Sequence, residues 1–225
     1  MSETTLTVRD LRRQWKPHKE RLQQLNPEHP TNVRFHRACS WLQQAESLLE
    51  HKDWDSILLT QWIAFNALYG QWSDQAREPC SDRESWRGFQ ERAVQLDRGG
   101  HISGMLLENR RLAIKIFEDE YLSRYFWQEP GQHSKKRARR DGHQASTWFL
   151  EKRWRTILEN LLERIYFLRC QLVHGAATYK GALNRKATEY SAIMLGHVLR
   201  AYLQVWIHYG ADENWGLMCY PPLRG

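Results

Sequence analysis

Apolar residues recur along most of this chain at the three- and four-residue spacing of an amphipathic helix. The alternation that a half-buried strand requires is absent, and proline and glycine fall between the periodic segments. The pattern therefore predicts an all-α fold. We expect helices over about 6–25, 32–49, 55–69, 84–96, 102–117, 148–173 and 187–209.

The order of these segments predicts one domain over residues 1–225. Its core is a helical bundle built from about 32–72 and 148–209, and about 73–147 form a helical and loop elaboration between the two halves. Within the elaboration, residues 128–146 are rich in glycine, lysine and arginine and predict an exposed, mobile basic loop. At this length the chain can bury a sizeable core.

Composition narrows the choice of partners. Lysine and arginine number 33 against 26 acidic residues, a net charge of +7, so a polyanion is a more natural partner than an acidic surface. No run of about 18 apolar residues predicts a membrane span. The four cysteines are scattered, which is typical of reduced thiols in a cytoplasmic protein. Metal-ligand spacings and phosphate-binding glycine loops are absent, so we expect neither a metal nor a cofactor.

The segment with the clearest chemical potential is 169–175, which reads RCQLVHG at the end of the long helix over 148–173. On structural grounds alone it is an ordinary helix end, since Gly175 suits the left-handed position that follows a helix. On chemical grounds, His174 can move a proton near neutral pH and Arg169 can stabilise extra negative charge on a phosphodiester. That chemistry needs no metal.

Helix geometry constrains this pair. Residues 169 and 174 are five positions apart, so on a regular helix their side chains lie about 140° apart. They share one substrate atom only if the helix ends between them or if a second subunit completes the site.

The motif, its place and the bundle together resemble the HEPN superfamily, whose signature is R-x4–6-H at the end of a long helix before a last helix. Residues 62–70 (WIAFNALYG) also resemble the earlier bundle helix of Apea-like HEPN proteins. The resemblance covers about 32–209, with 73–147 unmatched. It implies a homodimeric, metal-independent endoribonuclease, a toxin or phage-defence effector that produces 2′,3′-cyclic phosphate and 5′-hydroxyl ends. A cognate antitoxin or another defence-system protein is the further partner it implies.

Carried onto this sequence, the resemblance makes Arg169 the group that stabilises the phosphorane and His174 the general acid or base. Many active members have Asn, Asp or His directly after the arginine, where this chain has Cys170, and Gln171 is the neighbour that can replace that polar group. Asn66, a polar residue in an apolar helix, either lines the groove near the pair or bonds a neighbouring helix.

Other interpretations remain open. The basic run can grip RNA phosphates or simply be a solvated surface; its cations are Lys135, Lys136, Arg137, Arg139 and Arg140. The alternative to an enzyme is a non-catalytic HEPN module that binds RNA, a nucleotide or a protein, a reading that Cys170 favours. A purely structural dimerisation subunit is a third interpretation.

Overall fold

The computed structural model describes residues 6–128 and 131–221. The α-helices are α1 (Val8–Leu25), α2 (Pro30–Ser47), α3 (Trp54–Tyr69), α4 (Asp82–Leu96), α5 (His101–Glu108), α6 (Arg110–Glu118), α7 (Arg124–Gln128), α8 (Gln132–Leu150), α9 (Trp154–Val173) and α10 (Arg185–Tyr209). Two short 3-10 helices, η1 (Leu48–His51) and η2 (Glu120–Leu122), accompany them. Both ends of the predicted domain, and residues 129 and 130 of the predicted basic loop, lie outside the described residues.

The chain is mostly helical, as its apolar spacing predicts. A small antiparallel hairpin joins α3 to α4, formed by β1 (Trp72–Ser73) and β2 (Glu78–Pro79) with Trp72 opposite Pro79. Strands of two residues are too short to produce an alternating pattern, so the sequence carried no sign of them.

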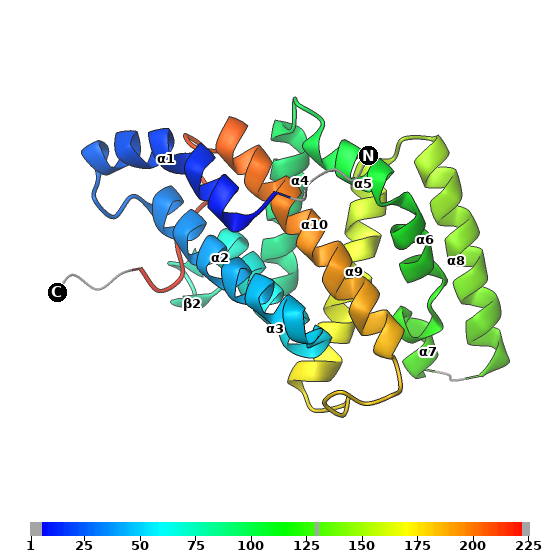
Figure 1. Cartoon of the computed structure of the whole chain (residues 1–225). Coiled ribbons are helices and arrows are strands. Elements are labelled where there is room, and N and C mark those ends of the chain that lie inside the picture. The colour runs from blue at the N-terminus through cyan, green and yellow to red at the C-terminus, as the bar shows by residue number, and fades with distance from the viewer. Residues whose placement is uncertain (1–5, 129–130, 222–225) are drawn as a thin grey trace.

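Helix α10 lies at the centre of the bundle and contacts α1, α3, α4, α5, α6 and α9 (Figure 1). Helices α2 and α3 form a helical hairpin on one side of it, and α8 lies at the opposite edge against α6. Sixteen residues of α10 are buried. A helix that is apolar around most of its circumference must be covered on all sides, which explains this central place.

One cluster of buried apolar side chains links these helices. The elaboration between the two predicted halves contributes large members to it, among them Trp86 and Phe89 of α4, Ile102 of α5 and Phe117 of α6. Residues 73–147 therefore help to build the core and are not only an outer layer.

The predicted basic loop is wrong, because α8 covers Gln132–Leu150. Lysine, arginine, alanine and glutamine all have high helix propensity. Ala138, Gly142, Ala145 and Phe149 recur at helical spacing, and this buried stripe faces the body of the bundle. At Gly142 a β-carbon would lie 2.4 Å from the side chain of Glu118, so glycine allows α6 and α8 to pack closely. The stripe consists mainly of small residues, so average hydrophobicity concealed it.

Two of the predicted helices are divided. The helix expected over 148–173 begins only at Trp154, because Lys152 adopts a left-handed conformation (φ 55°) and the chain turns from α8 into α9. The helix expected over 102–117 is divided at Asn109 (φ −100°, ψ 18°) into α5 and α6. Neither turn contains glycine or proline, which are the usual sequence signals of a break.

Candidate functional site

The RCQLVHG segment ends α9 in a complete Schellman motif. Gly175 has φ +69°, the amide of Ala176 donates to the carbonyl of Gln171 at 2.8 Å, and the amide of Gly175 donates to that of Leu172 at 3.3 Å. These bonds satisfy carbonyls that the last turn would otherwise leave free. The prediction of a left-handed Gly175 is confirmed, and the motif fixes the backbone on both sides of His174.

Arg169 is half-buried between two aromatic rings from different helices. Its guanidinium carbon lies 5.9 Å from the ring centroid of Trp62 on α3 and 5.9 Å from that of Tyr166 on α9. Such cation–π contacts hold a guanidinium group without neutralising it. Within residues 6–128 and 131–221 no carboxylate forms an ion pair with Arg169. Its charge is therefore available to an anion.

His174 is exposed and does not share the direction of Arg169. Helix α9 continues through Val173, and His174 itself keeps φ −89° and ψ 9° while its amide donates to the carbonyl of Cys170 at 2.9 Å. The helix therefore does not end between the two residues, and their side chains diverge by about 140°. Of the two arrangements that allow a shared substrate atom, only completion by a second subunit remains.

The two residues after Arg169 differ in their contacts. The Cys170 Sγ is 4.0 Å from a nitrogen of the Arg169 guanidinium, a weak contact. Burial raises the pKa of the Tyr166 hydroxyl, the thiol of Cys170 acts in the same direction, and the charge of Arg169 opposes both. Gln171 takes part in the Schellman motif through its backbone carbonyl.

Asn66 lines a cavity of about 360 Å³ next to this end of α9, together with Tyr69 and Asp82. Its Oδ1 is buried and finds no hydrogen-bond partner among the described residues. The Tyr69 hydroxyl donates to Asp82 Oδ1 at 2.5 Å. Burial and then Asp82 raise the pKa of Tyr69, whereas Arg169 acts in the opposite direction, so all these groups influence one another electrostatically.

The segment after His174 is attached to the start of α3. The Tyr179 hydroxyl donates to Asp53 Oδ2 at 2.6 Å, and the amide of Lys180 donates to Asp55 Oδ2 at 2.8 Å. Arg185 at the start of α10 binds the same Asp55 carboxylate with two nitrogens, each at 2.9 Å. A bidentate pair of this kind is geometrically specific. The loop between α9 and α10 is thus tied down close to the motif.

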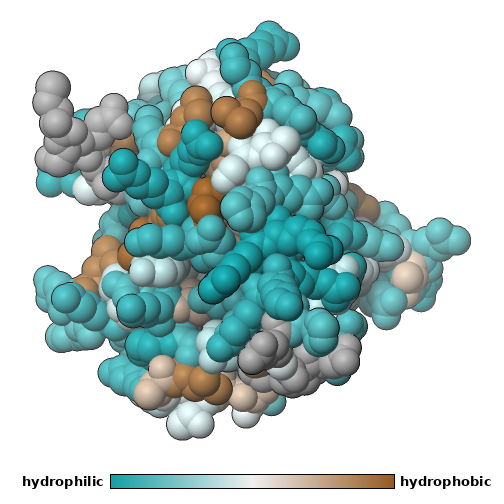
Figure 2. All heavy atoms as spheres, turned by 90° about the vertical axis from the view of Figure 1, so that its right-hand side faces the viewer, coloured by the Kyte–Doolittle hydropathy of each residue, from teal (hydrophilic) through white to brown (hydrophobic). Residues whose placement is uncertain are grey.

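The predicted basic residues form an exposed face of α8. Lys135, Lys136, Arg137, Arg139 and Arg140 are all exposed. Lys135 pairs with Glu120 at 3.6 Å, and the Arg137 guanidinium lies 4.0 Å from the ring centroid of Tyr125. Figure 2 views the side of the molecule on which α8 lies, and most of that surface is hydrophilic. The structure does not bring these cations together with Arg169 and His174 as one site.

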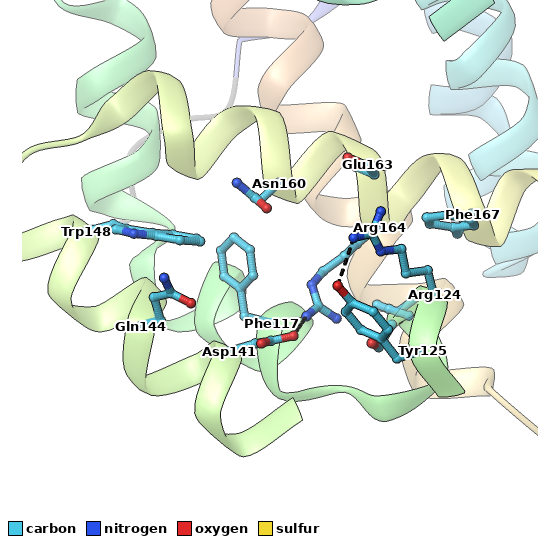
Figure 3. Close-up of a pocket in the computed structure, with 12 residues that line it drawn as sticks. Phe117, Arg124, Tyr125, Asp141, Gln144, Trp148, Asn160, Glu163, Arg164 and Phe167 are labelled. Atoms are coloured by element: carbon cyan, nitrogen blue, oxygen red, sulfur yellow. Dashed lines mark hydrogen bonds and ion pairs between the residues drawn. The ribbon is translucent and has the colours of Figure 1, made fainter. Parts of the chain in front are cut away.

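A cavity of about 330 Å³ lies between α8, α9 and the segment around α7 (Figure 3). Its lining combines aromatic rings, amides and charged groups: Phe117, Tyr125, Trp148, Phe167, Gln144, Asn160, Arg124, Arg164, Asp141 and Glu163. Arg164 pairs with Asp141 at 2.5 Å, and Arg124 donates to the Tyr125 hydroxyl at 2.8 Å. Rings and amides are the groups that stack on and hydrogen-bond a nucleobase.

Sequence reasoning missed the two rings around Arg169 and the buried Arg164. Trp62 lies in a continuous apolar stretch, so nothing in its spacing distinguishes a ring that contacts a cation from a core residue. Arg164 did carry a signal, because it falls three residues after Leu161 and four before Leu168, on the apolar face of α9. A charge at such a position requires a partner.

Among the described residues, no three His, Cys, Asp or Glu side chains gather as metal ligands. The helices within 6–128 and 131–221 include none with the length and apolar character to cross a bilayer. No family model, no curated protein and no solved structure matches this chain.

Proposed function

We propose that this protein is a metal-independent endoribonuclease of the HEPN type, acting as a toxin or as an effector of defence against phage. The observation that carries the proposal is the state of Arg169: a guanidinium held between two rings, with no paired carboxylate among the described residues, on the helix that ends at an exposed His174. This combination suits an anionic substrate with a proton to move.

The reaction needs only these two side chains and the substrate. The 2′-hydroxyl of the RNA attacks the neighbouring phosphorus, and the O2′–P bond forms as the P–O5′ bond breaks. His174 conveys the proton from the 2′-hydroxyl to the departing 5′-oxygen, and Arg169 stabilises the extra negative charge of the phosphorane. The products are a 2′,3′-cyclic phosphate and a 5′-hydroxyl.

The divergence of Arg169 and His174 gives the proposal a quaternary form. In a two-fold homodimer, Arg169 of one protomer can face the substrate together with His174 of its partner. The exposed position of His174 on a fixed loop favours such an arrangement. The cations of α8 would hold the RNA backbone outside this site, with an affinity that weakens as salt rises.

Cleavage of total cellular RNA in EDTA tests the chemistry. We expect the parent protein to produce 2′,3′-cyclic phosphate ends, and the Arg169→Ala and His174→Ala variants to remain folded and to produce none. A folded His174→Ala variant that cuts as fast as the parent would rule out this assignment.

Mixing the two inactive variants tests the composite site. If each site takes Arg169 from one protomer and His174 from the other, random reassociation restores about one quarter of the parent activity, because about half of the dimers are mixed and each mixed dimer has one intact site. No recovery after demonstrated subunit exchange would mean that the site lies within one protomer.

A non-catalytic HEPN module that binds RNA, a nucleotide or a protein is the second candidate. The specific observation in its favour is that Cys170 occupies the position after Arg169 and makes only a weak contact with it. It predicts that the parent binds RNA tightly in a salt-dependent way and leaves it intact over long incubation. If the chain binds neither RNA nor nucleotide, an antitoxin or another defence-system protein becomes the expected partner of the motif.

A further inference from the structure

A second cationic surface lies on the other side of the bundle, in a groove between α1 and α2 with a volume of about 950 Å³. Six lysine and arginine side chains line it: Arg9, Arg12, Arg13, Lys16, Lys19 and Arg37. Glu20 is the one carboxylate among the lining residues that the structure describes. In Figure 1, α1 and α8 lie at opposite edges of the molecule, so this groove is separate from the basic face of α8.

Five of these cations form a row along one face of α1. Positions 9, 12, 13, 16 and 19 recur at intervals of three or four residues, the spacing of one helix face. From Arg9 to Lys19 the row spans about 15 Å. Like charges one turn apart repel, and Arg9 also stands in the first turn, where the helix dipole disfavours a cation. Folding alone does not explain such an arrangement.

The protein itself neutralises the row only in part. Arg13 pairs with Asp10 at 3.0 Å and Lys16 with Glu20 at 3.8 Å, and both basic side chains remain more than 70% exposed. Arg12 donates to the uncharged Gln43 Oε1 at 2.7 Å, and Arg37 donates to the carbonyl of Tyr220 at 2.8 Å. Within the described ranges, Arg9 and Lys19 form no ion pair. The groove therefore keeps a large positive charge.

The floor of the groove argues against an apolar ligand. Trp15 and Phe35 stack with ring centroids 4.6 Å apart and are only 3% and 2% exposed. Trp15 Nε1 donates to Asn32 Oδ1 at 3.1 Å, which keeps the indole in place. None of the large exposed apolar side chains in the described part lines the groove. An acidic amphipathic helix or a lipid surface would therefore find little apolar area to bury, and charge must supply the affinity.

We infer that this groove binds the phosphate backbone of a single strand of RNA, with Arg9, Lys16 and Lys19 contacting successive phosphates. A positively charged groove that follows an extended strand is the usual form of such a site. The inference does not depend on cleavage by Arg169 and His174, since the groove holds the strand without reacting with it. It adds a second contact surface at the opposite edge from α8.

Fluorescence anisotropy with labelled 2′-O-methyl RNA tests the inference. This RNA lacks the 2′-hydroxyl nucleophile, so the measurement reports binding whether or not the protein is a nuclease. The variant Arg9→Ala/Lys16→Ala/Lys19→Ala removes three exposed cations. Its control, Arg98→Ala/Arg111→Ala/Lys186→Ala, removes three exposed cations outside both basic surfaces.

We expect the groove variant to bind at least about tenfold more weakly and its salt slope to fall by about 2, because each lost phosphate contact removes about 0.7 from the slope for a single strand. The control variant should retain most of the affinity. If both variants lose the same amount, the groove has no particular role and the inference is overturned. The same holds if the groove variant keeps its RNA affinity but loses binding to a poly-glutamate peptide or to anionic vesicles.

Discussion

Two arginines on α9, five residues apart, show how different surroundings give one residue type two roles. Arg164 is 10% exposed at its side chain, pairs with Asp141 of α8 at 2.5 Å, and has its pKa lowered by burial. Arg169 lies between the rings of Trp62 and Tyr166 and, among the described residues, pairs with no carboxylate. The neighbouring helix decides the difference, because α8 offers a carboxylate and α3 offers a ring. A paired buried charge fastens the fold, whereas an unpaired charge on rings is free to bind.

The largest effect should come from removing the free charge. We expect Arg169→Gln to lower the rate of RNA cleavage by about 100-fold or more, because it removes the group that stabilises the phosphorane. The free energy of unfolding should change by less than about 1 kcal/mol, the size of an exposed cation–π contact. Single-turnover cleavage and urea denaturation measure the two quantities. Arg155→Gln, on the same helix and exposed, is the control; an equal loss in both would refute a special role for Arg169.

Breaking the paired charge should have the opposite profile. Asp141→Asn leaves Arg164 without its counter-charge, and we expect the free energy of unfolding to fall by about 2 kcal/mol, less than for a fully buried pair because Asp141 is 28% exposed. Cleavage per folded molecule should be unchanged. Glu151→Gln breaks a pair in which both partners are 52% exposed and should cost less than about 0.5 kcal/mol. Equal costs for the two variants would contradict a structural role for Arg164.

The Schellman motif that positions His174 is the next test. Gly175 has φ +69°, so Gly175→Ala should lower the free energy of unfolding by about 1 kcal/mol through backbone strain. Gly88→Ala is a matched control: it lies inside α4 with open space around its α-carbon, and there alanine should stabilise by about 0.5 kcal/mol. Thermal unfolding of both variants measures the difference, and a stabilised Gly175→Ala protein would show that the turn is not left-handed in solution.

The smallest effect concerns a buried counterpart of His174. On α10, burial and then the positive charge of Arg200 lower the pKa of His197. The unfolded chain, with a histidine pKa near 6.5, therefore takes up a proton more readily than the folded one. This contribution to stability is present above about pH 6.5 and is lost as the pH falls toward the lower pKa of the folded state. The variant His197→Gln should unfold with a weaker pH dependence in that window, whereas His174→Gln should behave as the parent does.

The sequence was sufficient where a local pattern determines the structure. Apolar spacing predicted most of the helices, and Gly175 predicted the left-handed turn after α9. It failed where distant segments decide the outcome. The buried stripe of α8 consists mostly of small residues that look polar on average, and the turn at Lys152 has no glycine to reveal it.

The candidate site divides in the same way. The sequence indicated Arg169 and His174 and even the angle between them, since that angle follows from helix periodicity alone. It did not indicate that Trp62, more than 100 positions earlier, supplies a ring to Arg169, because that contact depends on how α3 packs against α9. The cations along α1 were visible as residues, but the groove that makes them a surface requires α2 beside them.

The small-residue stripe of α8 has a consequence for motion. Ala138, Gly142 and Ala145 bring α8 close to α6 but remove little apolar area from water, so the basic helix is attached less firmly than α10, which is enclosed on all sides. Amide hydrogens of α8 should therefore exchange with solvent through local opening long before those of α10. The chain can release its basic helix as a unit, turning at Lys152, while the central helices stay closed.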